Sequence, residues 1–269
     1  MDWAECNGVS LRYALEGEGP TLVLVHEMGG TLESWDGAAA GLSRRFRLLR
    51  HDQRGAGGSE KVRARFTLDD LRDDLGALLD RLGLPAPFHL MGAAMGAAVA
   101  VMLAAERPSQ VGSLALLNPA TEVDAARAAS MRERAVRIAA DGMRATMPAT
   151  LDRSWPPEAR GDGAAFARYR ARYLGYDPVG LALQNEALAG VALGDAPERI
   201  ACPTLVLAGA QDPIRPPPTV RAFAARIPGA AFDILGTAHF MAAQAPAALL
   251  GRLAPFHDAL GIPAAEAAA

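Results

Sequence analysis

Short apolar runs alternate along the chain with longer segments of helical periodicity. The run Thr21–His26 (TLVLVH) is apolar almost throughout, which is typical of a central parallel strand that is buried on both faces. The alternation of strands and helices predicts a mostly parallel sheet with helices on both of its faces. The predicted strands are Thr21–His26, Phe46–Arg50, Phe88–Met91, Val111–Leu117, Thr204–Ala208 and Ala231–Leu235.

Two helices of this core can be placed from their ends. A helix over Leu68–Leu82 follows Thr67, a residue type favoured at the N-cap. Asp69 and Asp70 fall in its first turn, where negative charge is favourable. A second helix, Met95–Glu106, is built of small residues and begins directly after the predicted strand at Phe88–Met91.

The pattern changes between Thr121 and about Pro197. Strand-like runs disappear there, and Ala- and Arg-rich helical segments alternate with prolines and glycines. We expect a helical cap over residues 121–197, inserted between two strands of the sheet. The core would then consist of residues 1–120 and 198–262, and residues 263–269 would form a frayed tail.

Composition and charge exclude several classes of protein. The 269 residues are 51% apolar and 21% charged, as in ordinary globular domains. The net charge of −3 and the lack of a basic stripe give no reason to expect nucleic acid as a partner. The longest apolar run, Leu90–Ala105, is interrupted by glycines and is shorter than the ~20 residues of a membrane span, so we expect no membrane partner.

The location and cofactor content follow from what the chain lacks. The N-terminal residues have neither a basic nor an apolar signal region, so a cytoplasmic protein is expected. Cys6 and Cys202 show no metal-ligand spacing and are interpreted as thiols in a reduced compartment. No phosphate-binding glycine loop or ligand cluster is visible, so neither a metal nor an organic cofactor is predicted.

Chemistry is suggested first by Gly92-Ala93-Ala94-Met95-Gly96. A buried strand runs into this segment and a helix leaves it, which matches the G-x-S-x-G nucleophile elbow except at its central residue. The elbow strains that residue and requires small neighbours, and Gly92 and Gly96 meet this requirement. Ala94 therefore occupies the position of a nucleophile.

Two later segments complete the pattern. Asp212 follows the strand Thr204–Ala208, and His239 follows the strand Ala231–Leu235. Both lie at the carboxyl ends of strands, where open α/β sheets place their sites. An elbow, an acid and a histidine in this order match the α/β-hydrolase order.

On these residues the chain resembles the α/β-hydrolase superfamily over nearly its whole length. Within the superfamily it is most similar to the 3-oxoadipate enol-lactonases of aromatic catabolism. That likeness rests on the turn after Arg50 and on two cap segments, Arg137–Met143 and Tyr176–Pro178. The superfamily motifs are His26–Gly30, Asp52–Ser59, the elbow, Gly209–Pro213 and Gly236–His239.

The resemblance implies an α/β-hydrolase fold and a role for each matching residue. Asp212 would orient the histidine, and His239 would act as general base. Met95 would supply one N–H of the oxyanion hole, and the loop after His26 a second. In that loop Glu27 replaces the usual glycine. Its side chain either points to solvent, so that only its N–H matters, or is a proton donor that burial keeps neutral.

The substrate is expected to be a small molecule, and the oligomeric state is not predicted. Met28, Arg153 and Trp155 are expected to contact this substrate. His51, interpreted as the start of a turn, and His89, interpreted as a core or interface histidine, have no predicted catalytic role.

Alanine has no heteroatom, so Ala94 cannot form an acyl-enzyme. Either a serine was deliberately replaced, which would give an inactive form, or the protein naturally lacks the nucleophile. In the second case His239 would activate water for attack on a small carboxylic ester or enol-lactone. Two alternatives remain open. One is a cofactor-independent lyase or dioxygenase in which His239 deprotonates the substrate, and the other is a non-catalytic ligand-binding protein of the same fold.

Overall fold

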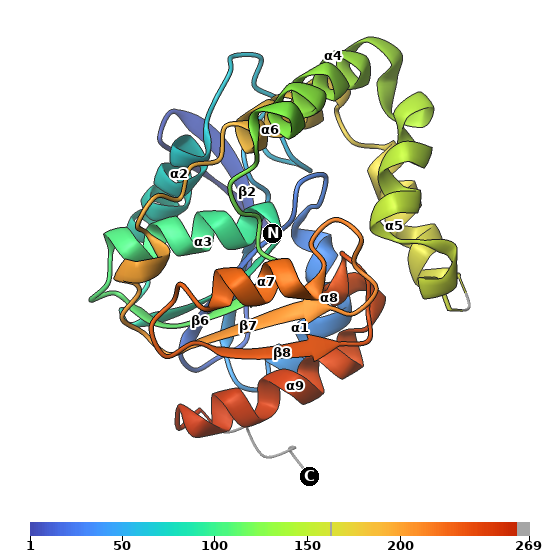
Figure 1. Ribbon diagram of the computed structural model, residues 1–269. Coiled ribbons are helices and arrows are strands. Elements are labelled where there is room, and N and C mark those ends of the chain that lie inside the picture. Colours follow the sequence, from blue (N-terminus) through green and yellow to red (C-terminus); the bar gives the residue numbers. More distant parts are fainter. Residues whose placement is uncertain (162, 263–269) are drawn as a thin grey trace.

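The computed structural model describes residues 1–161 and 163–262, so the tail predicted at 263–269 lies outside them. The described residues form an eight-stranded sheet in the order β1-β2-β4-β3-β5-β6-β7-β8, with helices on both faces (Figure 1). The strands are β1 (Asp2–Cys6), β2 (Val9–Glu16), β3 (Thr21–Val25), β4 (Arg47–His51), β5 (Phe88–Ala93), β6 (Val111–Leu117), β7 (Thr204–Gly209) and β8 (Ala231–Leu235).

The parallel part of the sheet extends from β4 to β8, and the sequence pattern predicts every strand in it. The hairpin β1–β2 was not predicted, and β2 joins the sheet antiparallel to β4. The turn that joins β1 to β2 is Asn7–Gly8, and the φ angles of these two residues are 50° and 75°. Asn-Gly is a strong hairpin signal because both turn positions require positive φ.

Nine α-helices occur in the described chain, and two core clusters hold six of them against the sheet. Val23 and Val25 of β3 face a cluster built with α2, α3 and α7, whereas Leu22 and Leu24 face α1, α8 and α9. All five residues of β3 are buried, which confirms the predicted two-sided central strand. The helices are α1 (Asp36–Leu42), α2 (Leu68–Arg81), α3 (Met95–Glu106), α4 (Ala125–Met147), α5 (Ala164–Leu174), α6 (Pro178–Ala189), α7 (Pro217–Ala224), α8 (Met241–Gln244) and α9 (Pro246–Ala259).

Helix α2 begins as predicted. The side chain of Thr67 accepts a hydrogen bond from the N–H of Asp70, and the Asp70 carboxylate accepts one from the N–H of Thr67 at 2.7 Å. This reciprocal pair is a capping box, which satisfies two N–H groups at the start of the helix.

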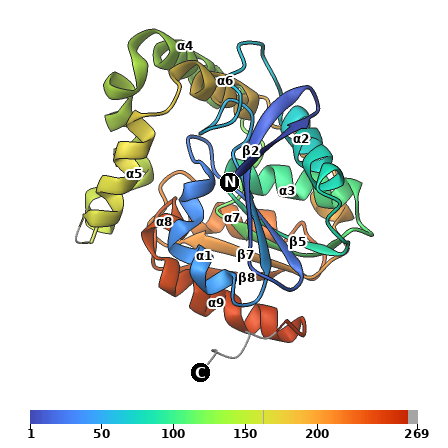
Figure 2. The same cartoon turned by 180° about the vertical axis from the view of Figure 1, so that it is seen from behind.

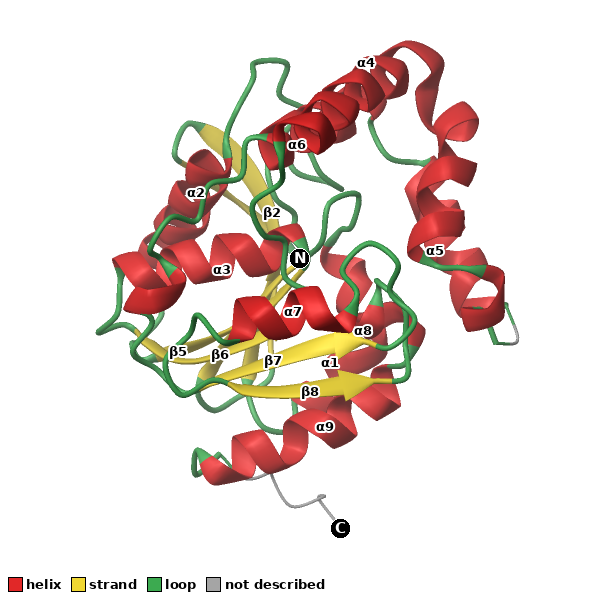
Figure 3. Ribbon diagram, in the orientation of Figure 1, coloured by secondary structure: helices red, strands yellow, loops and turns green. Residues whose placement is uncertain are grey.

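Helices α4, α5 and α6 form the predicted insertion between β6 and β7. Figures 1 and 2 show them outside the two helical layers of the core, and Figure 3 shows the arrowheads of β7 and β8 on the same side as α5. An aromatic cluster that includes Trp155, Tyr169 and Tyr173 packs this insertion internally and against Phe240 of the core. The insertion therefore lies at the carboxyl edge of the sheet. None of the described helices combines the length and apolarity that a membrane crossing requires.

Several histidines are structural. His89 is buried in β5, and its Nδ1 lies 2.8 Å from the hydroxyl of Ser113, which confirms a satisfied core histidine. His51 does not start a turn but ends β4, where burial lowers its pKa to about 3. Burial, with help from the charge of Arg45, lowers the pKa of His257 in α9 to about 4.

The buried histidines predict acid sensitivity. The unfolded chain protonates His257 as the pH falls through its ordinary pKa of about 6.5, but the folded protein does not until about pH 4. The free energy of unfolding should therefore be highest above pH 6.5 and fall by on the order of 3 kcal/mol toward pH 4 from this residue alone. Urea unfolding at a series of pH values measures this loss.

His257→Leu is the matched variant for this experiment. It should reduce the slope of unfolding free energy against pH by about one proton, or ~1.4 kcal/mol per pH unit, between pH 4 and 6.5. An identical slope in both proteins would contradict the assignment.

Candidate functional site

The site is organised by a strained turn between β5 and α3. Ala94, the single residue between them, has φ 48° and ψ −109°, a conformation that costs a non-glycine residue about 1–3 kcal/mol. Its N–H donates to the carbonyl of Leu117, and its own carbonyl accepts from the N–H of Ala120 at 3.0 Å. These bonds attach the turn to the end of β6. The backbone of a nucleophile elbow is therefore present, with a methyl group at its centre.

Two glycines make this geometry possible. A Cβ on Gly96 would lie 2.2 Å from the carbonyl oxygen of Val25, and a Cβ on Gly92 would lie 2.5 Å from the Cα of Ala97. Both obstacles are backbone atoms, which cannot move aside as side chains do. Glycine at both positions is thus required for α3 to approach β3 and β5.

The predicted acid and histidine meet beside the elbow. Asp212 follows β7 and His239 follows β8, and Nδ1 of His239 lies 2.7 Å from Oδ2 of Asp212. The other carboxylate oxygen of Asp212 accepts hydrogen bonds from the N–H groups of Ile214 and Arg215. Although burial raises it, the pKa of Asp212 is held below its ordinary value by His239 and these N–H donors. An ionised Asp212 fixes the proton on Nδ1 and leaves the lone pair of Nε2 free to act as a base.

Asn118 positions both loops and was not predicted as a site residue. It follows β6 with φ 44° and is fully buried. Its amide nitrogen donates to the carbonyls of Ala238 and His239, each at 3.1 Å, and its amide oxygen accepts from the N–H of Gly209. One side chain therefore joins the loop of the acid to the loop of the histidine. Its place after a buried strand, in line with Asp212 and His239, was the available signal.

One cavity brings most of the predicted residues together. Ala94, Met95 and His239 line it, together with Glu27 and Met28. From the insertion and the loop after β7 it is also lined by Arg127, Arg134, Arg153 and Arg215. The predicted contacts at Met28 and Arg153 thus lie at the cavity.

Trp155 does not lie at this cavity. It is 1% exposed, is not among the residues that line the cavity, and donates its indole N–H to the carbonyl of Ala159. Its ring packs edge-on against Phe166 and Tyr169. The structure therefore places Trp155 in the packing of the insertion and not at the wall of the cavity, where it was expected.

Glu27 does not point to solvent, which removes one of its two predicted roles. Its side chain is buried, and Oε1 accepts hydrogen bonds from the hydroxyls of Ser34 at 2.8 Å and Tyr169 at 2.7 Å. A Cβ on Gly30 would lie 2.5 Å from the same oxygen, so the loop makes room for this carboxyl group. Ser34 accepts in turn from Arg172 of α5. Glu27 thus links the loop after β3 to the insertion.

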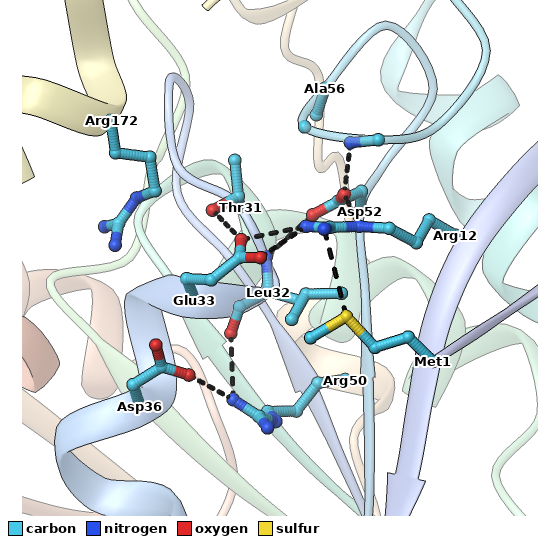
Figure 4. Close-up of polar contacts among 12 residues, drawn as sticks. Met1, Arg12, Thr31, Leu32, Glu33, Asp36, Arg50, Asp52, Ala56 and Arg172 are labelled. Atoms are coloured by element: carbon cyan, nitrogen blue, oxygen red, sulfur yellow. Dashed lines mark hydrogen bonds and ion pairs between the residues drawn. The ribbon is translucent and has the colours of Figure 1, made fainter. Parts of the chain in front are cut away.

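Charged side chains anchor the loop after β3. Figure 4 shows Arg12 between Asp52 and Glu33, with Thr31 beside Glu33. Oδ1 of Asp52 accepts from the N–H of Leu32 at 2.8 Å, and Oδ2 accepts from Arg12. Burial raises the pKa of Asp52, but the donors around it, Arg12 above all, keep it below its ordinary value. An ionised Asp52 therefore anchors the loop that carries Glu27.

His26 fixes the start of the same loop. Its Nδ1 lies 2.7 Å from the carbonyl of Glu27, and its Nε2 accepts from the N–H of Gln53. Gln53 also donates its side-chain amide to the carbonyl of His26 at 2.7 Å. Gln53 was not predicted to take part in the site.

Within the described residues, no group of three or more His, Cys, Asp or Glu side chains is placed to hold a metal ion.

Comparison with known proteins places this geometry in a family. The α/β hydrolase fold family matches residues 20–246, and the chain belongs to that family. The chain is 27% identical over 250 residues to 3-oxoadipate enol-lactonase 2 of Acinetobacter baylyi, covering 92% of each protein.

Solved structures give the same result. The crystal structure of the enol-lactonase from Burkholderia xenovorans LB400 aligns with a TM-score of 0.90 and 29% identity, covering 96% of this chain and 100% of that one. A malate-bound thermophilic esterase from Thermogutta terrifontis aligns with a TM-score of 0.88 and 25% identity, covering 94% of each chain. The fold predicted from the sequence is confirmed, and the protein is similar to hydrolases of the esterase and enol-lactonase type.

The elbow predicts a sharp contrast between two glycine variants. Gly96→Ala should lower the free energy of unfolding by more than about 3 kcal/mol, because its Cβ would meet the carbonyls of Val25 and His26. Gly251→Ala in α9, where a Cβ meets nothing within 4 Å, should raise it by up to about 1 kcal/mol. Urea denaturation of both variants measures the difference. Equal effects would contradict the tight approach at Gly96.

Proposed function

We propose that this protein hydrolyses a small carboxylic ester or enol-lactone without forming an acyl-enzyme. The observation that carries this proposal is that His239, hydrogen-bonded to Asp212 at 2.7 Å, lines the same cavity as the methyl group of Ala94. The base and its orienting acid are present, and the covalent nucleophile is not. The similarity to enol-lactonases and esterases supports acyl chemistry in this cavity.

In the proposed reaction a water molecule is the nucleophile, in place of a side chain at position 94. Nε2 of His239 removes a proton from a water molecule while the water oxygen bonds to the acyl carbon. The C–O bond of the ester then breaks, and the leaving oxygen takes the proton back from the imidazolium. Asp212 stabilises that imidazolium and keeps the ring in the productive tautomer. An ester gives a carboxylic acid and an alcohol, whereas an enol-lactone gives one ring-opened molecule that carries both the carboxylic acid and the enol.

An enol-lactone suits this route better than an alkyl ester. An enol is a stronger acid than an alcohol, so its conjugate base leaves more readily and the acyl carbon is more reactive. The enol that is released converts to the ketone, which makes the reverse reaction unfavourable. A reactive acyl group therefore compensates for the weaker attack of water compared with an activated serine.

The developing oxyanion would be held by main-chain N–H groups. Met95 is the first residue of α3, where N–H groups have no acceptor within the helix. The second donor in the proposal is a main-chain N–H of Glu27 or Met28, which line the cavity from the opposite loop. The bonds from Ser34 and Tyr169 hold one oxygen of the Glu27 carboxyl group.

The unchanged protein and two variants test this function and its alternatives. The protein with Ala94 should hydrolyse an enol-lactone, and His239→Ala should reduce the rate by about 10²–10⁴-fold, the usual contribution of a general base. Ala94→Ser should add activity toward a simple aryl ester, with an acylated protein as intermediate. Steady-state assays on both substrates, with intact-protein mass spectrometry, measure these effects.

The other outcomes are equally specific. Activity that appears only in Ala94→Ser would mean that an ordinary hydrolase has lost its serine. Proton abstraction from the substrate with no hydrolysis product would indicate the lyase or dioxygenase chemistry. Saturable binding with no turnover in any variant would favour the ligand-binding protein.

The variant Asp212→Asn should distinguish the effect of Asp212 on the tautomer of His239 from its effect on the stability of the protein. The oxygen of Asp212→Asn can still accept from Ile214 and Arg215, but its NH₂ group faces Nδ1 of His239 and forces the proton onto Nε2. Turnover should fall by up to about 10⁴-fold with little loss of stability, as expected when a histidine is held in the wrong tautomer. Unchanged turnover would show that His239 is not the base.

A further inference from the structure

Four arginine side chains surround the cavity without carboxylate partners. Arg127 and Arg134 lie on α4, Arg153 lies shortly after it, and Arg215 follows Asp212. By comparison, 12 of the other 22 arginines form ion pairs within the described residues, such as Arg54 with Asp74. Within residues 1–161 and 163–262, none of these four side chains forms a hydrogen bond or an ion pair.

Two of the four are in positions where an unpaired charge is costly. Arg215 is only 7% exposed. Arg134 is half-buried, and its Nε and Nη2 atoms are buried without a hydrogen-bond partner among the described residues. A buried donor of a charged group that has no acceptor is destabilising, because it has lost its contacts with water and has gained no partner in exchange. Such groups are retained in proteins when a ligand or partner satisfies them.

The arginines also raise the positive potential of the cavity. Burial and the charge of Arg127 lower the pKa of Arg215 to about 10, so its guanidinium is still protonated at neutral pH. Burial, with the charges of Arg153, Arg137 and Arg127, lowers the pKa of Arg134 as well, although Tyr173 acts in the opposite direction. The positive charge of Arg127 disfavours that of Arg215, and a bound anion would offset this repulsion.

The charges around the cavity define the ligand. Glu27 is the one carboxyl group among the described lining residues, and Asp212 lies directly behind His239. Even with both of these ionised, the four guanidinium groups leave an excess of two positive charges. A ligand with two negative charges would balance this excess.

We propose that the cavity binds an acyl substrate with two carboxylate groups, one held by Arg215 and Arg127 beside the dyad and the other by Arg134 and Arg153 of the insertion. The anion-binding part follows from the cavity alone, whereas the acyl part rests on the proposed function. Guanidinium groups recognise carboxylates through paired N–H donors, so each carboxylate would satisfy donors that the protein leaves free.

Calorimetric binding to the whole chain tests this assignment. The probes are succinate, glutarate and adipate, each compared with the monocarboxylate of the same length, namely butyrate, pentanoate and hexanoate. The best dicarboxylate should bind at least about tenfold more tightly than its monocarboxylate, and the difference should shrink as salt is added. Equal binding of both series at every length would overturn the proposal.

Variants assign the two ends of the ligand. Arg134→Gln and Arg215→Gln should each reduce dicarboxylate binding to about the level of the monocarboxylate. Arg132→Gln, which removes an exposed arginine of α4 outside the cavity, should leave it unchanged. Arg134→Lys and Arg215→Lys keep the charge and should retain part of the affinity, which covers the case of a glutamine variant that fails to fold. Loss of affinity in Arg132→Gln equal to that in Arg134→Gln would contradict the site.

Different results would contradict the proposed hydrolysis and the proposed anion-binding cavity. Tight dicarboxylate binding with no hydrolysis of any ester would leave the anion site in place and contradict the proposed function. Hydrolysis of a neutral enol-lactone with no preference for dicarboxylates would support the function and contradict the anion site.

Discussion

The structure depends on the close approach of α3 to β3 and β5 at the elbow. Only glycine fits at positions 92 and 96, because any Cβ there would collide with backbone atoms. This approach forces Ala94 into its strained conformation and places the first N–H groups of α3 at the cavity. Bonds from Ala94 to Leu117 and Ala120 extend the same arrangement to β6. A backbone that serves a nucleophile is therefore maintained although no nucleophile is present.

In the proposed function, electrostatic interactions would support catalysis at a site that has no nucleophile. The hydrogen bond that Nδ1 of His239 donates to Asp212 keeps His239 in the tautomer that a base requires, and Asn118 holds both of their loops. Across the cavity, unpaired arginines supply positive charge that would orient an anionic substrate over Ala94. In the proposed mechanism, precise placement of substrate and base replaces covalent catalysis, because a held acyl group lowers the entropic cost of attack by water.

The parallel sheet and its helices were predictable because their signals are local. Helix α3 and strands β6 and β8 have the predicted bounds, and β5 is longer only because it runs into the elbow. The order of Ala94, Asp212 and His239 along the chain, each directly after a strand, was sufficient to predict that they lie close together. The β1–β2 hairpin was missed although its Asn7–Gly8 turn carries a local signal.

The environment of individual side chains was not predictable, because it depends on contacts between distant segments. Trp155 was expected at the cavity but packs against Phe166 and Tyr169 of the insertion. The burial of Glu27 depends on Tyr169, which is 142 residues away in the sequence. Likewise, Asn118 joins two loops that are far from it along the chain.

The most direct measurement is intact-protein mass spectrometry during a single turnover of an enol-lactone by the protein with Ala94. The proposed mechanism predicts that product forms while the mass of the protein stays unchanged at every time point, because water attacks the substrate directly. A transient acyl adduct on the protein, or the absence of product with enzyme in excess, would contradict it.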